Sequence, residues 1–190
     1  SIKMMAEINE EYTISDAVTA LGEMLHYNMR WNKFLVTVQD EMNYIQNYVE
    51  LMNLRYDFTI TLSVQIPENL YRQDIPKMSL QPIVENAIYH GLKYKESKGM
   101  LTVNGYQKDG NAVIEIADDG VGMDEETLNR IFEKHKVNYR SNGVGVYNVQ
   151  RRLCMYYGKE YGLSYKSEKG KGTTVTVVIP IEQEEHHEKA

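Results

Sequence analysis

The sequence predicts an α+β protein, a two-layer sandwich in which helices cover one face of a mostly antiparallel sheet. Runs with helical and with strand periodicity are mixed along the chain without a regular strand-helix-strand alternation. In the second half, strand-like runs come in pairs separated by short turns, which is typical of β-hairpins. Two apolar helices precede these elements, so we expect a helical hairpin in front of the sandwich.

Residues 13–35 and 38–52 carry the two helical stripes, each with apolar side chains at spacings of three and four residues. The stripes consist of Ile14, Val18, Leu21 and Leu25, and of Val38, Met42, Ile45, Val49 and Met52. They predict an antiparallel hairpin, or half of a helical bundle that a second chain completes. Packing of both stripes on the neighbouring domain is an equally good interpretation.

The composition changes at Asp57, and this change suggests a domain boundary. We expect a helical segment at 1–56 that belongs to a dimerisation region, a catalytic domain at 57–182 and a solvated tail at 183–190. The opening residues read as the inside of a helix rather than its start, so we expect a fragment of a longer protein.

The domain is expected to open with a strand at 58–66, which Pro67 ends, and a loop at 68–76. The later elements are expected in the order helix 79–93, hairpin 100–118, short helix 124–132, helix 145–158 and hairpin 163–180. Ser79 is the expected N-cap of the first of these helices, because its hydroxyl can accept a backbone N–H.

Composition and charge exclude several classes of protein. The chain has 190 residues, 42% of them hydrophobic and 25% charged, as in ordinary globular proteins. A net charge of -6 argues against a nucleic-acid surface, which needs a basic footprint. The single cysteine, Cys154, excludes a disulfide within the chain and fits a reducing cytosol. No apolar run is long enough to span a membrane, so we expect a soluble, cytoplasmic piece.

The stretch VIEIADDGVGM ends a strand-like run with two adjacent carboxylates and two glycines. Alternation along a strand puts Asp118 on the same face as Ile114 and Ile116. A carboxylate on an apolar face is costly unless donors reach it, so we expect Asp118 to accept hydrogen bonds from a ligand. Gly120 and Gly122 would allow a sharp turn and close approach of that ligand. Taken alone, an Asp-Gly pair is more typical of a surface turn.

Three further motifs give this stretch a context. They are ENAIYHG in a predicted helix, NGVGVYNV at the start of another helix, and EKGKGTT in a hairpin turn. In this order and spacing, the four motifs resemble the N, G1, G2 and G3 boxes of the GHKL (Bergerat) ATP-binding fold of histidine kinases, Hsp90, MutL and gyrase B. With MLHYNMRW, EMNYIQNYVELMNLRY and LQPIVENAIYHG, nearly the whole chain is similar to sensor histidine kinases of the LytS/YesM type.

The resemblance implies roles for the residues around the nucleotide. Asp118 would accept the 6-amino group of adenine and repel the carbonyl oxygen of guanine, so the site would select ATP over GTP. Asn86 would coordinate Mg²⁺ through its side-chain oxygen, a type of ligand that this cation prefers. Thr173 would support the adenine end of the site near Asp118, and Gly120 and Gly122 would form its floor.

The resemblance also implies contacts to the phosphates. The residues that would receive them at a helix N-terminus are Gly143, Val144, Gly145 and Val146. Residues 133–142 would form a short, mobile lid over the nucleotide. The basic residues of this lid are Lys134, Lys136 and Arg140. His90 and Lys93 follow the N box and would reach a phosphate or the ribose.

Two departures from the family pattern limit what the chain is expected to do. Tyr89 stands where many histidine kinases carry a basic residue, which puts phosphate contacts on that side in doubt. The Pro-His-Phe-x-Tyr-Asn motif that holds the phosphorylated histidine in similar kinases does not occur, and His26 lies in a different part of the pattern. Glu85 is not expected to be a general base, because adjacent helix residues point about 100° apart.

The sequence therefore predicts the catalytic, ATP-binding part of a two-component sensor histidine kinase. Such a kinase transfers the ATP γ-phosphoryl group to a histidine, here absent, and then to an aspartate of a response regulator. The expected cofactors and partners are ATP, Mg²⁺, a second copy bound through the N-terminal helices, and the response regulator. The parent protein would span the membrane. The alternatives are a GHKL ATPase, a protein serine kinase, or a non-enzymatic module for dimerisation or docking.

Overall fold

The computed structural model describes residues 1–29, 34–95, 98–128 and 144–181. The helices are α1 (Ile2–Ile8), α2 (Tyr12–Met29), α3 (Val38–Arg55), α4 (Glu68–Tyr71), α5 (Gln81–Asn86) and α7 (Val144–Tyr157), with a π-helical turn (Ala87–Gly91) and a 3₁₀ turn (Leu92–Tyr94) after α5. The strands are β1 (Leu35–Thr37), β2 (Thr59–Gln65), β3 (Asp74–Pro76), β4 (Lys98–Lys108), β5 (Asn111–Asp118), β6 (Gly162–Glu168) and β7 (Gly172–Pro180).

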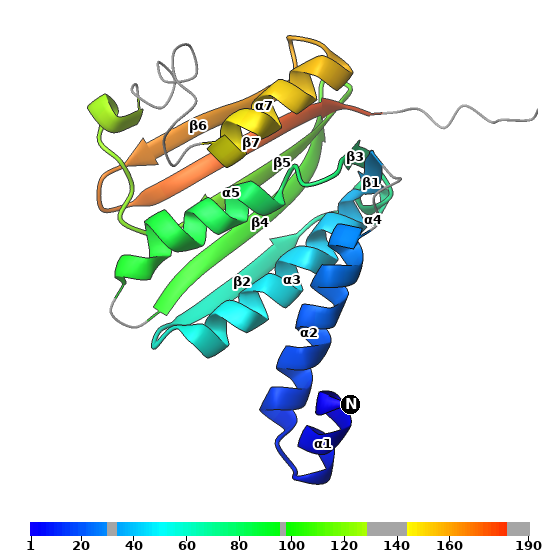
Figure 1. The fold of residues 1–190 in the computed structure, drawn as a ribbon. Helices are drawn as coiled ribbons and strands as arrows, with labels where there is room; N and C mark the ends of the chain where they lie inside the picture. The colour runs from blue at the N-terminus through cyan, green and yellow to red at the C-terminus, as the bar shows by residue number, and fades with distance from the viewer. Residues whose placement is uncertain (30–33, 96–97, 129–143, 182–190) are drawn as a thin grey trace, which may run out of the picture.

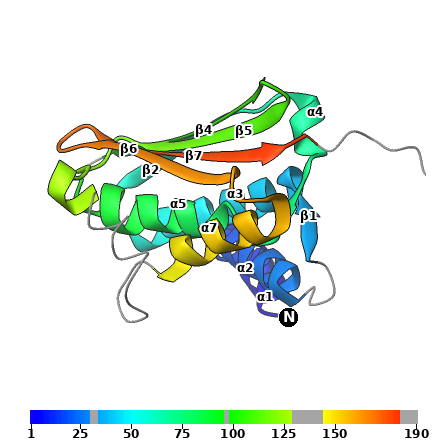
Figure 2. The same ribbon diagram turned by 90° about the horizontal axis from the view of Figure 1, so that it is seen from above.

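The main sheet has the strand order β2-β4-β5-β7-β6. The strands β4, β5, β7 and β6 pair antiparallel, and β2 joins the edge parallel to β4. The helices α3, α5 and α7 lie side by side on one face of this sheet (Figures 1 and 2). The predicted α+β sandwich with a mostly antiparallel sheet is therefore confirmed.

The core lies between the sheet and this layer of helices. Ile114 and Ile116 of β5 are almost completely buried on the face that the helices cover. From the helix side, Ile45 of α3, Ile83 of α5 and Leu153 of α7 belong to the same buried cluster. Each such side chain contributes about 1.5–3 kcal/mol through burial of apolar surface. The alternation expected for β5 therefore directs the next inward residue, Asp118, into the same layer.

The two helical stripes differ in what covers them. Val38, Met42, Ile45 and Val49 of α3 are buried, so this stripe forms part of the sandwich. In α2, by contrast, Ile14, Leu21 and Leu25 are about half exposed. Both stripes have the same spacing, but only the second packs on the neighbouring domain. Among the described residues, no helix has the length and apolar character needed to cross a membrane.

Two local expectations were wrong. The segment 68–76 is not a loop throughout, because it contains the short helix α4 and the strand β3, which pairs with β1. Ser79 does not cap the next helix: α5 begins at Gln81, and the Ser79 hydroxyl donates to the carbonyl oxygen of Pro76 at 2.5 Å. The N–H groups at the start of α5 are satisfied instead by a carboxylate from another helix, which is described below. Of the predicted helix 124–132, residues 125–128 are helical and the rest lies outside the described residues.

Candidate functional site

Asp118 occupies the end of β5 at the centre of the sheet, opposite Leu101 of β4 and Thr173 of β7. Its side chain is only 8% exposed, and its Oδ1 atom accepts the N–H of Gly120 at 2.9 Å. Burial raises the pKa of this carboxyl group to about 6, although hydrogen bonds from the backbone of Gly120 and Thr173 act to lower it. Because a carboxylate has about four acceptor positions, Asp118 retains acceptor capacity for a further donor.

Two glycines let the backbone pack closely around Asp118. A β-carbon at Gly91 would lie 2.5 Å from Oδ1 of Asp118. A β-carbon at Gly120 would overlap the carbonyl carbon of Gly91, and Val121 donates its N–H to the Gly91 carbonyl oxygen at 3.2 Å. The π-helical turn that follows Asn86 is therefore joined directly to the turn that follows Asp118.

The turn between β6 and β7 also packs against the backbone around Asp118, and together with Gly91 and Gly120 it forms the cradle of this carboxylate. Gly122 has φ +61°, and Gly172 has φ +99°, a backbone region that side chains rarely adopt. A β-carbon at Gly172 would overlap the carbonyl oxygen of Asp118. The Ser167 hydroxyl accepts the N–H of Met123 at 2.8 Å and lies 2.9 Å from the Thr173 hydroxyl. The predicted G1 and G3 motifs are thus in direct contact, with Thr173 beside Asp118.

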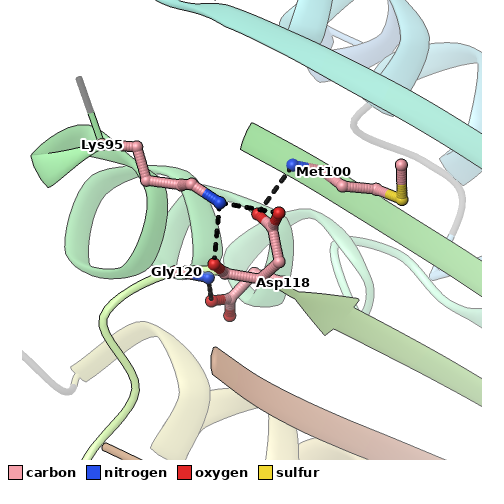
Figure 3. A network of polar contacts seen from close by, with 5 residues as sticks. Lys95, Met100, Asp118 and Gly120 are labelled. Carbon is pink, nitrogen blue, oxygen red and sulfur yellow. Dashed lines mark hydrogen bonds and ion pairs between the residues drawn. The ribbon is translucent and has the colours of Figure 1, made fainter. Parts of the chain in front are cut away.

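The second carboxylate of the pair, Asp119, contacts Lys95 and Met100, which are labelled in Figure 3. Its Oδ1 atom accepts the N–H of Met100 at 2.8 Å, and its Oδ2 atom forms an ion pair with Lys95 at 2.7 Å. Burial acts to raise the pKa of Asp119, but the contacts with Lys95 and Met100 outweigh it and lower this pKa. Asp119 therefore ties the start of β4 to the end of the helical segment, while Asp118 points into the interior.

Asn86 is the last residue of α5, where the α-helix gives way to the π-helical turn. Such turns are rare and often occur at functional positions. The first turn of α7 lies close to α5, because a β-carbon at Gly145 would be 3.4 Å from that of Pro82. The structure thus brings the G2 helix, with a buried Val146, next to the helix of Asn86. Gly143, Arg140 and the expected lid lie outside the described residues; Val144 is described as the first residue of α7.

The side chains of Tyr89, His90 and Lys93 are exposed. The Lys93 ammonium lies 4.4 Å from the centre of the Tyr89 ring, and His90 meets the same ring edge-on at 4.9 Å. Glu85, just before Asn86, accepts the side-chain N–H of Gln81 at 2.8 Å. This contact holds one of the two carboxylate oxygens of Glu85. That Glu85 is not a general base stays a prediction.

Sequence reasoning missed three residues of this cradle, Gly91, Ser167 and Gly172. Gly91 and Gly172 lie inside the N and G3 motifs. In a predicted helix, as at Gly91, a glycine costs about 1 kcal/mol relative to alanine, so its presence there indicates a packing requirement. Ser167 has no such signal, because the local sequence of a strand does not indicate which distant residues its side chains will contact.

The comparison with known families decides the relationship. Residues 76–183 match the family model described as histidine kinase-, DNA gyrase B- and HSP90-like ATPase. The chain belongs to this ATPase family. Residues 1–60 match a second model, described as histidine kinase. Membership of an ATPase family implies ATP binding, and the two matches together confirm the predicted resemblance to histidine kinases.

Curated relatives of this ATPase-family chain are sensor kinases. It is 30% identical to sensor histidine kinase YesM of Bacillus subtilis (strain 168) over 97% of this chain and 30% of that protein. It is 32% identical to sensor protein LytS of Oceanobacillus iheyensis over 84% of this chain and 28% of that protein. The chain thus spans roughly a third of the length of these relatives. The predicted likeness to the LytS/YesM type is confirmed.

Solved structures of low sequence identity support the fold. The histidine kinase domain of the Erythrobacter litoralis EL346 blue-light activated kinase has a TM-score of 0.54 at 19% identity, over 89% of this chain and 75% of that one. The catalytic domain of histidine kinase ThkA has a TM-score of 0.58 at 10% identity, over 77% of this chain and 95% of that one. These likenesses support the architecture of the family member and say nothing further about its site.

Proposed function

We propose that this chain is the catalytic, ATP-binding part of a two-component sensor histidine kinase. The observation that carries the proposal is the buried carboxylate of Asp118 at the end of β5, enclosed by the backbone of Gly91, Gly120 and Gly172. A buried acceptor with unused capacity needs a donor from a ligand. The 6-amino group of adenine is such a donor, whereas guanine would present an oxygen to the carboxylate. The site therefore prefers ATP to GTP.

The adenine is proposed to lie against the close backbone contacts around Asp118. Gly120 lets the turn after Asp118 pack on the backbone of Gly91, and Gly122 lets it pack on the carbonyl oxygen of Glu168. Thr173, opposite Asp118 on β7, is proposed to support the same end of the site. The hydroxyl contact between Thr173 and Ser167 holds the threonine in place at 2.9 Å. Selectivity for the base thus rests on one carboxylate and on the turns that aim it.

Asn86 is proposed to hold Mg²⁺ through its side-chain oxygen. The described residues contain no cluster of three or more histidine, cysteine or acidic side chains that could hold a metal ion by itself. One amide oxygen next to nucleotide phosphates fits Mg²⁺, which keeps several waters and takes few protein ligands. When bound, the cation supplies positive charge to the phosphates. Asn86 is half-buried at the end of α5, and Pro82 of the same helix lies against Gly145 of α7.

The phosphates are proposed to lie at the N-terminus of α7, a helix of 14 residues whose first N–H groups and dipole favour anions. The residues involved are Gly143, Val144, Gly145 and Val146, with Arg140 from the lid. His90 and Lys93 are proposed to contact a phosphate or the ribose from the side of the N box. The packing of Lys93 on Tyr89 keeps this ammonium near the end of the helical segment.

The reaction is proposed to be transfer of the γ-phosphoryl group of ATP to a histidine nitrogen, followed by transfer to an aspartate of a response regulator. Phosphoryl transfer depends mainly on positioning and on charge stabilisation, which the residues above would provide. The accepting histidine would come from outside these 190 residues. We therefore expect the chain to bind ATP without phosphorylating itself.

A second copy of the chain is proposed as a partner through α2. Its half-exposed apolar stripe is of the kind that a parallel or antiparallel helix of another subunit covers. The complete protein is proposed to be associated with the cell membrane, with this part on the cytoplasmic side.

Calorimetric titration with a non-hydrolysable ATP analogue tests the proposal. We expect binding that Mg²⁺ strengthens, that GTP does not compete for, and that Asp118→Asn weakens at least tenfold. Equal binding of ATP and GTP analogues would remove the role of Asp118. Complete absence of nucleotide binding would leave a module for dimerisation or docking as the remaining function.

A further inference from the structure

The turn that precedes α5, residues 77–81, is held by three helices that are distant in the sequence. The central group is Glu41 of α3, whose side chain is 1% exposed. Its Oε1 atom accepts the N–H of Met78 at 2.6 Å, and its Oε2 atom accepts the N–H groups of Leu80 at 2.8 Å and Gln81 at 3.3 Å. Glu41 therefore provides the N-terminal cap that Ser79 does not.

The turn itself has a backbone conformation that needs support. Met78 has φ +62°, which is uncommon for a residue with a side chain and persists only where surrounding contacts enforce it. Glu41 holds the N–H of Met78 from one side. From the other side, Arg152 of α7 donates to the carbonyl oxygens of Lys77 and Met78. The turn is thus fixed between α3 and α7.

The last turn of α2 makes the third contact. The Tyr27 hydroxyl donates to Oε1 of Glu41, and the Tyr27 ring packs 5.3 Å from that of Tyr44. In return, the Lys77 ammonium donates to the carbonyl oxygens of Tyr27 at 2.5 Å and Asn28 at 3.3 Å. A cation is favourable at a helix C-terminus, where carbonyl groups lack partners within the helix. The end of α2 and the start of α5 therefore share one network of polar contacts.

This network continues to the residue next to Asn86. The side-chain N–H₂ group of Gln81 donates to the Tyr44 hydroxyl and to the Glu85 carboxylate, both at 2.8 Å. The helix α5 has only six residues, so a shift at its N-terminus is carried over about 7.5 Å to Asn86. A short helix of this kind has little stability of its own and depends on its cap.

We propose that Glu41 is a positioning residue for Asn86, and that the contact between Tyr27 and Glu41 makes nucleotide binding depend on how the last turn of α2 lies against α3. The proposal rests on the proposed function, because it requires Asn86 to face the nucleotide. Coupling between two sites is reciprocal. Nucleotide binding must therefore also stabilise the end of α2.

The test compares three variants of the full chain. Tyr27→Phe removes the hydroxyl but leaves Glu41 with its backbone donors, so the fold is preserved. Glu41→Gln replaces one acceptor oxygen by a donor that faces N–H groups. Tyr48→Phe is the matched control. Tyr48 lies about two turns after Glu41 on α3 and is half-buried, and it has no hydrogen bond among the described residues to α2 or to residues 77–81.

Two quantities are measured for each variant: the affinity for a Mg²⁺-bound non-hydrolysable ATP analogue, and the hydrogen exchange of residues 24–29 with and without the analogue. We expect Tyr27→Phe to weaken binding about fivefold, within the usual range of coupling between sites, and Glu41→Gln to weaken it more. The analogue slows exchange at the end of α2 in the original chain and in Tyr48→Phe, but not in Tyr27→Phe.

The outcomes separate this inference from the proposed function. If the original chain does not bind the analogue, the proposed function fails and the inference fails with it. If the original chain binds and Tyr27→Phe has the same affinity and the same exchange response, only the coupling is refuted. A loss of thermal stability without a change in the exchange response would assign Glu41 a purely structural role.

Discussion

Gly91 and Asp118 lie in direct contact, and a β-carbon at residue 91 would stand 2.5 Å from the Oδ1 atom of the carboxylate. Real β-carbons do not approach oxygen atoms this closely, so Gly91→Ala must displace Asp118 or the π-helical turn. Overpacking of this kind costs about 1–3 kcal/mol. We expect Gly91→Ala to lose nucleotide binding and to lower the free energy of unfolding by this amount, measured by calorimetric titration and urea denaturation.

The control for this substitution is Gly22→Ala in α2. Apart from the adjoining backbone of α2, no heavy atom of the described residues lies within 4 Å of a β-carbon at Gly22, and alanine favours a helix by about 1 kcal/mol over glycine. Gly22→Ala should therefore stabilise the protein and leave nucleotide binding unchanged. A Gly91→Ala protein that binds the nucleotide normally would refute the role assigned to this contact.

Asp118 should make the stability of the nucleotide-free protein fall as the pH rises. Its pKa is raised from 3.8 to about 6 by burial, so the folded state holds the proton more strongly than the unfolded state does. The resulting stabilisation is complete below pH 3.8 and is lost as the pH rises through 6. The loss is roughly 3 kcal/mol for a shift of about two pKa units.

Asp118→Asn removes this effect. The free energy of unfolding of Asp118→Asn minus that of the original chain should be larger at pH 7.5 than at pH 4.5. Denaturation curves at the two pH values measure this difference. A difference in the free energy of unfolding that is the same at both pH values would mean that burial does not raise the pKa of Asp118.

Nucleotide affinity should have the opposite dependence on pH at this site. The ionised carboxylate accepts the adenine amino group, whereas the protonated form directs an O–H at it. Below about pH 6, affinity for the ATP analogue should therefore fall by up to roughly tenfold per pH unit. The phosphates of the analogue also change protonation with pH. They contribute equally to the pH dependence of affinity for the original chain and for Asp118→Asn, so the difference between the two profiles reports on Asp118. Parallel pH profiles for the two proteins would contradict the assignment.

The sequence could predict those parts of the fold and site that follow from local patterns. The inward direction of Asp118 follows from a period of two along β5, and it is observed. The helices and hairpins of the sandwich likewise follow from periodicity and turn residues, with boundaries shifted by a few positions. Asn86, with its unfavourable position inside a helix, is marked in the same local way.

The sequence could not predict contacts between distant segments. The cap of α5 comes from Glu41, 39 residues before Leu80, whereas helix-capping rules consider only neighbouring residues and so selected Ser79. The stripes of α2 and α3 have the same spacing, yet Ile45 is buried and Leu25 is half exposed. Periodicity identifies an apolar face but does not identify what covers it.

The two adjacent carboxylates should respond differently to substitution. Lys95 is 29% and Asp119 47% exposed at the side chain, so their ion pair contributes only about 0–1 kcal/mol. We expect Lys95→Ala to lower the free energy of unfolding by less than about 1 kcal/mol and to change nucleotide affinity less than about threefold. Asp118→Ala should abolish binding. If Lys95→Ala abolished binding as well, Asp119 and Lys95 would belong to the nucleotide site rather than to its frame.

The exposed stripe of α2 predicts that the chain associates through this helix. Leu21 and Leu25 are 50% and 53% exposed, and they lie on one face of the helix at a spacing of four residues. Replacing both by glutamate places charges in the proposed interface, where burial of unpaired charge is costly. Light scattering coupled to gel filtration should then find a dimer for the original chain and a monomer for the double variant, with nucleotide affinity unchanged.

The matched control for the α2 variant is Met155→Glu on α7, which adds a charge at a side chain that is 75% exposed and lies on a different helix. This variant should remain dimeric, because α7 belongs to the layer under the sheet and not to the α2 face (Figure 2). A monomeric Met155→Glu protein would move the interface to α7. A double variant of Leu21 and Leu25 that remained dimeric would show that the apolar face of α2 is not where two copies meet.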